Sequence, residues 1–365
     1  MLTLPAWRDL LVQVAQPYKP SRARPVIFVT PPSPVSTTFH VPLTAYSKLL
    51  HEALPALHYG EVPAELYDPV RYIMALGGKR IRPLLTLVAA GLFTDDVTPA
   101  VKPALALEVF HNFTLVHDDL MDAAPLRRTQ PTVHEQWNAN TAILSGDVML
   151  VRAYELLADH LADDLLRPLL KRFSTVAAEV CEGQQLDMVF EAASNVGVDD
   201  YLRMIELKTA VLLGFSLELG ARIAGASAET AEHLRAFGVG VGVAFQLRDD
   251  LLDVYGDSTT FGKQIGGDIL AAKKTFLLLT AQQELAAAGR PHELAKVLAD
   301  PALAPAHKVQ HVTALYDAFA VRAQAEALIQ QTYAAALQHL AAVPVPAARK
   351  APLQALTDQL LDRVS

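Results

Sequence analysis

The sequence has few features that would link the chain covalently or carry it across a membrane. Cys181 is the only cysteine among 365 residues, which excludes an internal disulfide and is typical of a reducing compartment. We expect this thiol to be a small buried residue. No stretch reaches the roughly 18 uninterrupted apolar residues of a membrane span, and no apolar block typical of a signal peptide follows the first charges. These absences predict a cytoplasmic protein without a transmembrane segment.

A large excess of positive charge is also missing. The net charge is −8, which argues against general binding to nucleic acid or to anionic membranes. Any affinity for a polyanion must therefore come from local basic patches. Hydrophobic residues make up 52% of the chain, enough to bury a substantial core, so disorder throughout is excluded.

Prolines are concentrated at the N-terminus, at positions 5, 17, 20, 25, 31, 32 and 34. This density forbids a long helix, and we predict that residues 1–40 form a poorly ordered extension without catalytic residues. From about Val41 the apolar residues recur at helical spacing, and convincing strand patterns are missing. We predict a single all-α domain over residues 41–365. The pattern predicts helices at 44–57, 64–77, 81–93, 100–122, 133–158, 163–190, 198–224, 228–253 and 271–288, with two or three more before the C-terminus.

Two aspartate clusters, at 117–122 and 248–253, interrupt this apolar pattern. Carboxylates at positions i and i+4 share one face of a helix, so each cluster can present two of them to a common point: Asp118 with Asp122, and Asp249 with Asp253. Hard oxygen ligands of this kind suit Mg²⁺. A single acidic run is as often a solvated turn, but two runs of the same spacing within apolar sequence favour a metal site.

Basic residues stand beside the acidic ones. The segment 77–83 has two glycines followed by Lys79, Arg80 and Arg82, at what reads as a loop that opens a helix. Backbone amides at a helix start together with Lys79 and Arg82 would suit a diphosphate group. Further basic residues follow each acidic cluster: Arg127 and Arg128 after the first, Lys263, Lys273 and Lys274 after the second.

This order of motifs resembles the trans-isoprenyl diphosphate synthases, the polyprenyl synthetase family, over residues 77 to 275. The segments that carry the resemblance are Gly77–Pro83, Asp118–Asp122, Gly183–Asp187, Lys208-Thr209, Asp249–Asp253, Phe261–Lys263 and Gly266–Ile269. The resemblance implies a helical bundle around a central cavity and a homodimer. It also implies Mg²⁺-dependent head-to-tail (1'-4) condensation of isopentenyl diphosphate with allylic diphosphates, with three ions bound beside the substrate.

The resemblance also implies roles for individual residues. Those that would hold Mg²⁺ are Asp118, Asp122, Asp249 and Asp253. Those that match the isopentenyl diphosphate site are Lys79, Arg82, His111 and Arg128. Those that match the allylic diphosphate and its cation are Arg127, Lys208, Thr209, Gln246, Lys263 and Lys273. Four more residues are expected to contact these side chains rather than the substrates or the metal ions: Asp119, Asp250, Gln184 and Asp187.

Product length is expected to depend on the residues before the first aspartate cluster. In the family, a bulky aromatic five residues before the first aspartate shortens the product, and Phe113 holds that position. Thr114 is small where one class of farnesyl enzymes has a second aromatic. On an ideal wheel Phe113 lies about 140° from Asp118 and Phe110 about 80°, so either ring can be the floor. We predict a C20 product, geranylgeranyl diphosphate, with C15 farnesyl diphosphate as the alternative.

Two other readings use the same resemblance. A non-catalytic subunit that regulates another prenyl synthase would have lost aspartate or basic residues, and none of the expected ones is missing here. A terpene cyclase would need the first cluster but no isopentenyl diphosphate site, so Lys79, Arg82, His111 and Arg128 count against it.

Overall fold

The computed structural model describes residues 43–256 and 266–361. Almost all the regular structure in these residues is helical, as the spacing of their apolar residues predicts. These residues belong to one compact unit, His40–Ser365. The expectations for residues 1–40 and for Lys263 lie outside the described residues. Cys181 is exposed, so our expectation of a buried thiol was wrong. No helix among the described residues is long and apolar enough to span a membrane.

The prediction of an all-α fold is confirmed. The first part of the chain forms α2 (Leu43–Ala53), the 3-10 helix η1 (Leu54–Ala56), α3 (Ala64–Ala75), α4 (Ile81–Gly91), α5 (Thr98–Met121), α6 (Val133–Gln136), α7 (Ala139–His160) and α8 (Asp163–Ala192). The second part forms α9 (Val198–Ile205), the π-helix η2 (Glu206–Ala210), α10 (Val211–Ile223), α11 (Ala228–Tyr255), α13 (Gly267–Leu270), α14 (Phe276–Ala287), α15 (Glu293–Ala299), α16 (Pro305–Ala318), α17 (Val321–Ala342) and α18 (Ala347–Leu361). A short hairpin of β1 (Leu126–Arg127) and β2 (Gln130–Pro131) follows α5.

Capping residues explain where the observed helices differ from the predicted ones. The helix predicted at 133–158 is two helices, because the side chain of Asn138 accepts a hydrogen bond from Thr141 N at 2.9 Å and starts α7 afresh. The helix predicted from residue 271 begins only at Phe276, where the Thr275 side chain caps the first turn. Beyond residue 288 the prediction of two or three helices was too low, since α15, α16, α17 and α18 follow.

The helix predicted at 198–224 contains the π-helical turn η2. Two glycines on other helices allow backbone to approach this turn closely. A Cβ on Gly183 of α8 would lie 2.2 Å from Lys208 N, and a Cβ on Gly242 of α11 would lie 2.6 Å from Ala210 Cα. Any larger residue would have to push η2 away. Single π-helical turns are often found at functional sites, and this one carries Lys208 and Thr209.

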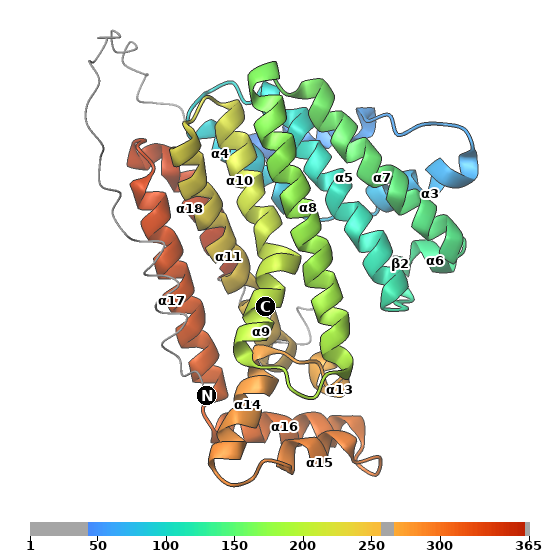
Figure 1. Cartoon of the computed structure of the whole chain (residues 1–365), viewed down its shortest axis with the longest axis vertical. Coiled ribbons are helices and arrows are strands. Elements are labelled where there is room, and N and C mark those ends of the chain that lie inside the picture. The colour runs from blue at the N-terminus through green and yellow to red at the C-terminus, as the bar shows by residue number, and fades with distance from the viewer. Residues whose placement is uncertain (1–42, 257–265, 362–365) are drawn as a thin grey trace. The chain divides into compact units, whose positions relative to one another are not determined.

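Long helices lie side by side and bury α5 on most of its faces (Figure 1). α5 packs against α4 and α7, and α11 packs against α10 and α17. The first aspartate cluster occupies the last turns of α5, and the second occupies the last turns of α11. Both clusters therefore lie at helix C-termini, where the peptide dipoles already present negative charge. Cations are needed to make such a placement favourable.

Candidate active site

The first aspartate cluster presents two carboxylates at the end of α5. Asp118 is half-buried and Asp122 is exposed. Burial raises the pKa of Asp118 to about 6; the nearby Lys208 opposes this shift, and the charge of Asp122 adds to it. A carboxylate that is partly removed from water beside a second carboxylate gains most from a bound cation.

The middle residue of this cluster faces the other way. The Asp119 side chain is 1% exposed and pairs with Arg127 of β1. Arg127 Nε donates to both carboxylate oxygens, at 2.8 and 2.7 Å, and Nη2 donates to Oδ1 at 2.6 Å. This contact ties the hairpin to the end of α5 and fixes the direction of the Arg127 guanidinium.

The second cluster repeats the spacing with different partners. Asp249 and Asp253 are half-buried, and Asp253 Oδ2 accepts a hydrogen bond from Asp268 N at 2.9 Å. Asp250 is 5% exposed and accepts hydrogen bonds from the Tyr201 hydroxyl and from Gln246. Burial raises the pKa of Asp250 to about 7, although both hydrogen bonds oppose the shift.

Lysines lie between the two clusters. Lys208 Nζ on η2 donates to Asp187 Oδ2 on α8 at 2.6 Å. Burial would lower the pKa of Lys273, but surrounding carboxylates, with Asp187 the largest, outweigh it and raise the pKa. The charges that act on Lys273 include Asp250 and Asp122, one from each cluster. The structure therefore brings together residues that are more than a hundred positions apart in the sequence.

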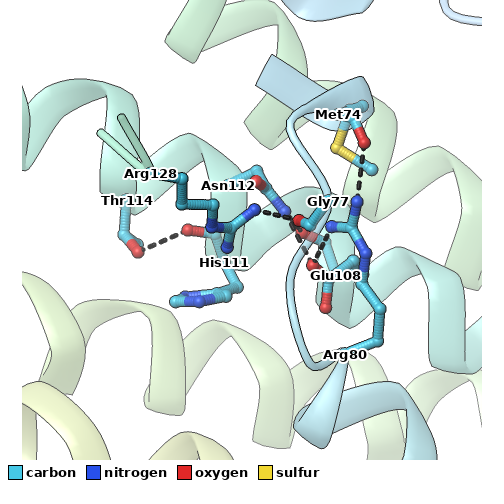
Figure 2. A network of polar contacts seen from close by, with 8 residues as sticks. All are labelled: Met74, Gly77, Arg80, Glu108, His111, Asn112, Thr114 and Arg128. Carbon is cyan, nitrogen blue, oxygen red and sulfur yellow. Dashed lines mark hydrogen bonds and ion pairs between the residues drawn. The ribbon is translucent and has the colours of Figure 1, made fainter. Parts of the chain in front are cut away.

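The basic loop before α4 has the left-handed backbone that its glycines allow. Gly77 and Gly78 have φ of 79° and 123°. The Arg128 guanidinium donates to Gly77 O, as Figure 2 shows. The φ of 123° at Gly78 is one that residues with a Cβ rarely adopt, so this position favours glycine. Lys79 is exposed at the middle of the loop.

Arg82 and His111 lie near this loop, and several arginine side chains make their surroundings positively charged. Arg82 Nε is buried without a hydrogen-bond partner among the described residues, and burial lowers the Arg82 pKa to about 10. Burial also holds the His111 pKa well below its usual range, and the nearby Arg82 and Arg128 lower it further. The imidazole is therefore neutral at pH 7 and can donate one N–H to an anion.

Aromatic rings fill the interior next to the first cluster. Phe110 is fully buried, with its ring centroid 5.4 Å from that of Phe113 and 5.1 Å from that of Phe173. Phe173 of α8 also contacts Tyr154 at 4.7 Å and Phe215 at 5.7 Å. Rings from α5, α7, α8 and α10 thus meet at one place.

The other expected residues are distributed around these groups. Thr114 is half-buried, and its hydroxyl donates to His111 O at 2.8 Å. Thr209 is half-buried on η2. Gln184 is 8% exposed, and neither polar atom of its amide has a hydrogen-bond partner among the described residues. A buried amide left in this way costs about 1–3 kcal/mol, which favours a polar ligand beside it.

Several residues of the site did not stand out in the sequence. Tyr201 binds the second cluster from α9, and Phe173 lies at the centre of the aromatic group. Glu108 of α5 pairs with Arg80 and accepts a hydrogen bond from Asn112. Glu108 had a detectable signal, since it is the one charged residue in the apolar run 104–110. The aromatic residues had none, because a buried ring in a helix is ordinary core.

The carboxylates fit a cation that is shared with a second molecule. In the described part of the chain, no group of three or more His, Cys, Asp or Glu side chains could hold a metal ion. Mg²⁺ is commonly bound through one or two carboxylates and the phosphates of a substrate. The desolvated Asp118 beside Asp122 has the oxygen donors that this arrangement requires.

Carboxylate pairs on two helices, with separate groups of cations beside them, have the chemistry that an enzyme needs to bind diphosphates together with divalent cations. The family model for polyprenyl synthetase matches residues 63–339. The chain belongs to this family, as its motifs led us to expect, and is a prenyltransferase. The family as a whole is Mg²⁺-dependent.

Individual relatives agree in fold and cover most of the chain. Geranylgeranyl pyrophosphate synthase of Geoglobus acetivorans is 40% identical over 240 residues, 65% of this chain and 75% of its own length. Geranylfarnesyl diphosphate synthase of Natronomonas pharaonis is 37% identical over 254 residues, 65% of this chain and 74% of its own. A crystal structure of a geranylgeranyl pyrophosphate synthase superposes with a TM-score of 0.83 at 41% identity, covering 88% of this chain and 99% of the other.

Proposed function

We propose that this chain condenses isopentenyl diphosphate head to tail with allylic diphosphates and releases C20 geranylgeranyl diphosphate. The observation that carries the proposal is the presence of two distinct groups of cations, one beside the aspartate clusters and one at the loop before α4. One diphosphate site would suffice for hydrolysis or cyclisation, whereas condensation needs two. Two of the three relatives described above are geranylgeranyl synthases, which supports the C20 product, and the third is a geranylfarnesyl synthase.

The isopentenyl diphosphate would bind at the loop before α4. Lys79, Arg82 and Arg128 supply positive charge there, and the neutral His111 supplies an N–H. Arg82 has a buried Nε without a partner among the described residues, so an anion would relieve its desolvation.

The allylic diphosphate would bind between the two aspartate clusters. Asp118, Asp122, Asp249 and Asp253 would hold Mg²⁺, which would neutralise the leaving diphosphate. Lys208, Lys273 and Arg127 would bind the same group directly, with Lys263 and Gln246 beside them. Because the positive groups are fixed before the reaction, they stabilise the developing charge without reorganisation.

Departure of the diphosphate leaves an allylic cation that the protein must protect from water. The Lys208 carbonyl, the Thr209 hydroxyl and the Gln246 amide oxygen would face this cation. The buried Gln184 amide, next in sequence to Gly183, has no hydrogen-bond partner among the described residues. The isopentenyl double bond then attacks, and the departed diphosphate takes the proton that is lost. No general base from the protein is required.

Product length would be set by the aromatic rings around Phe110. Phe110 contacts Phe173 of α8, whereas Phe113 contacts His117 on its own helix, with ring centroids 4.9 Å apart. We therefore place the floor at Phe110. Phe110→Ala should extend the product beyond C20, and Phe113→Ala should do so less. If neither change lengthens the product, this floor is wrong.

The decisive experiment is incubation of the purified chain with Mg²⁺, isopentenyl diphosphate and each of dimethylallyl, geranyl and farnesyl diphosphate, followed by sizing of the products. C20 from all three primers is the expected result. Products that stop at C15 would establish the farnesyl alternative. Absence of elongation with every primer would refute the proposal and favour a non-catalytic subunit.

We also propose that the protein is a homodimer that associates through α7. Ile143, Leu144 and Val151 on this helix are 43%, 59% and 61% exposed, an unusual density of large apolar side chains on a surface. A second copy of the same face would cover them. Sedimentation of the unsubstituted chain and of Val151→Glu should give a dimer and a monomer respectively; a monomeric unsubstituted chain would refute this.

A further inference from the structure

A buried carboxylate lies behind the loop before α4, outside both aspartate clusters. Glu108 is 2% exposed and stands three turns before Asp118 on α5, about 15 Å along the helix axis. It pairs with the Arg80 guanidinium. Asn112 Nδ2 donates to Glu108 Oε1 at 2.9 Å and to Glu108 O at 2.8 Å. Figure 2 shows the Glu108 carboxylate between the Asn112 amide and the Arg80 guanidinium.

The partner of this carboxylate holds an unfavourable backbone conformation. Arg80 is the N-cap of α4 with φ 49° and ψ 41°, in the left-handed region. This conformation is unfavourable for any residue with a Cβ. Two side-chain contacts keep it there: the pair with Glu108 and a hydrogen bond of 2.7 Å from Arg80 Nη2 to Met74 O. These two contacts of Arg80 form a clamp that joins the end of α3, the start of α4 and the middle of α5.

The position of the clamp decides what it controls. Arg80 stands between Lys79 and Arg82, so its dihedral angles set the spacing and direction of these two cations. The charge of Glu108 also acts on Arg82 and Arg128, where it raises the pKa of both guanidinium groups against the effect of burial. The loop before α4 and Arg128 thus share one buried counter-ion.

We propose that Glu108 is a positioning residue for the isopentenyl diphosphate site: it clamps Arg80, and through Arg80 it fixes Lys79 and Arg82 at the spacing that a diphosphate requires. Asn112 orients the carboxylate for this role. The inference rests on the proposed function, since it assigns one of the two substrates to this loop. It predicts that loss of the carboxylate weakens the binding of isopentenyl diphosphate and leaves the binding of the allylic diphosphate unchanged.

The test is Glu108→Gln, which keeps the shape and the hydrogen bond from Asn112 but removes the charge. We expect the KM for isopentenyl diphosphate to rise about tenfold, equivalent to one order of magnitude in affinity, while kcat and the KM for geranyl diphosphate stay within about twofold. Calorimetric titration with isopentenyl diphosphate alone should show the same weakening. An unchanged KM for isopentenyl diphosphate, or an equal rise in both KM values, would overturn the proposal.

Glu218→Gln is the matched control for a structural effect. Glu218 is also a buried carboxylate, 9% exposed, and it pairs with Arg172 Nε at 3.3 Å. Arg172 lies eleven residues before Gly183 on α8, about 16 Å along the helix from the turn that carries Lys208. This change should lower the free energy of unfolding and leave both KM values unaltered. The two variants then separate stability from substrate positioning.

A second variant keeps the proposal testable if Glu108→Gln does not fold. Replacing both partners, Arg80→Met with Glu108→Leu, removes the buried carboxylate together with the guanidinium that pairs with it, a kind of double replacement that is often tolerated. The double variant should fold and should still have a raised KM for isopentenyl diphosphate, because the clamp is gone. A KM equal to that of the unsubstituted enzyme would refute the positioning role. An unsubstituted chain that elongates no primer would instead refute the proposed function itself.

Discussion

The two aspartate clusters have the same spacing, but their middle aspartates, Asp119 and Asp250, have different partners. Asp119 of the first cluster is buried as a carboxylate against the Arg127 guanidinium. Asp250 of the second is buried against the Tyr201 hydroxyl and has its pKa raised to about 7. The cost of burying Asp119 is therefore offset by the charge of Arg127, and the cost of burying Asp250 is offset by partial protonation. Equal spacing in the sequence does not give equal electrostatics in the fold.

The largest effect should come from the outer aspartates. Asp118→Asn removes a proposed Mg²⁺ ligand, and we expect kcat to fall about 10³-fold, the scale of losing one strong electrostatic contact in a transition state. Asp249→Asn should cost about tenfold less, because we expect two of the three ions at the first cluster and one at the second. Steady-state rates at saturating Mg²⁺ measure both. Equal losses would show that the two clusters contribute alike.

The middle aspartates should differ in stability. Asp119→Asn leaves Arg127 without its counter-ion and should lower the free energy of unfolding by about 3 kcal/mol, as breaking a buried pair does. Asp250→Asn replaces a group that is about half neutral near pH 7, and should cost less than about 1 kcal/mol at that pH. Urea unfolding of both variants without Mg²⁺ tests the contrast, which similar losses would contradict.

The turn between the clusters should respond to added volume. Gly183→Ala would place a Cβ 2.2 Å from Lys208 N, so η2 must shift and carry Lys208 away from Asp187. We expect kcat to fall about 30-fold, equivalent to about 2 kcal/mol. Gly197→Ala is the control, because its Cβ would meet only Asp200 Oδ2, at 3.5 Å. Equal activity of the Gly183→Ala and Gly197→Ala variants would show that the position of η2 does not affect catalysis.

The smallest effect should be the part of the pH dependence of stability that Asp250 contributes. Its pKa is raised to about 7 in the folded state against about 3.9 unfolded. The folded state therefore holds more protons between these values, and stability falls as pH rises through this window and levels off above 7. The asparagine of the Asp250→Asn variant does not titrate. The free energy of unfolding of this variant, relative to that of the unsubstituted protein, should therefore rise by more than about 1 kcal/mol between pH 5 and pH 8. A constant difference in unfolding free energy would contradict this.

Much of the helical architecture could be read from the sequence because apolar spacing specifies helices locally. The aspartate clusters and the basic loop were visible for a similar reason, since charges inside apolar runs are costly unless they have a partner. The break at Asn138 and the π-helical turn at Lys208 were not visible. The first depends on a local side-chain cap, and the second depends on contact with α8 and α11.

The sequence by itself determined which residues can share a helix face, and so which carboxylates can act together: Asp118 with Asp122, and Asp249 with Asp253. The tertiary structure alone decided what opposes them. It placed Arg127 against Asp119, Tyr201 against Asp250 and Arg80 against Glu108. Helix periodicity is a local property of consecutive residues, whereas burial and counter-charge are set by residues that only folding brings together.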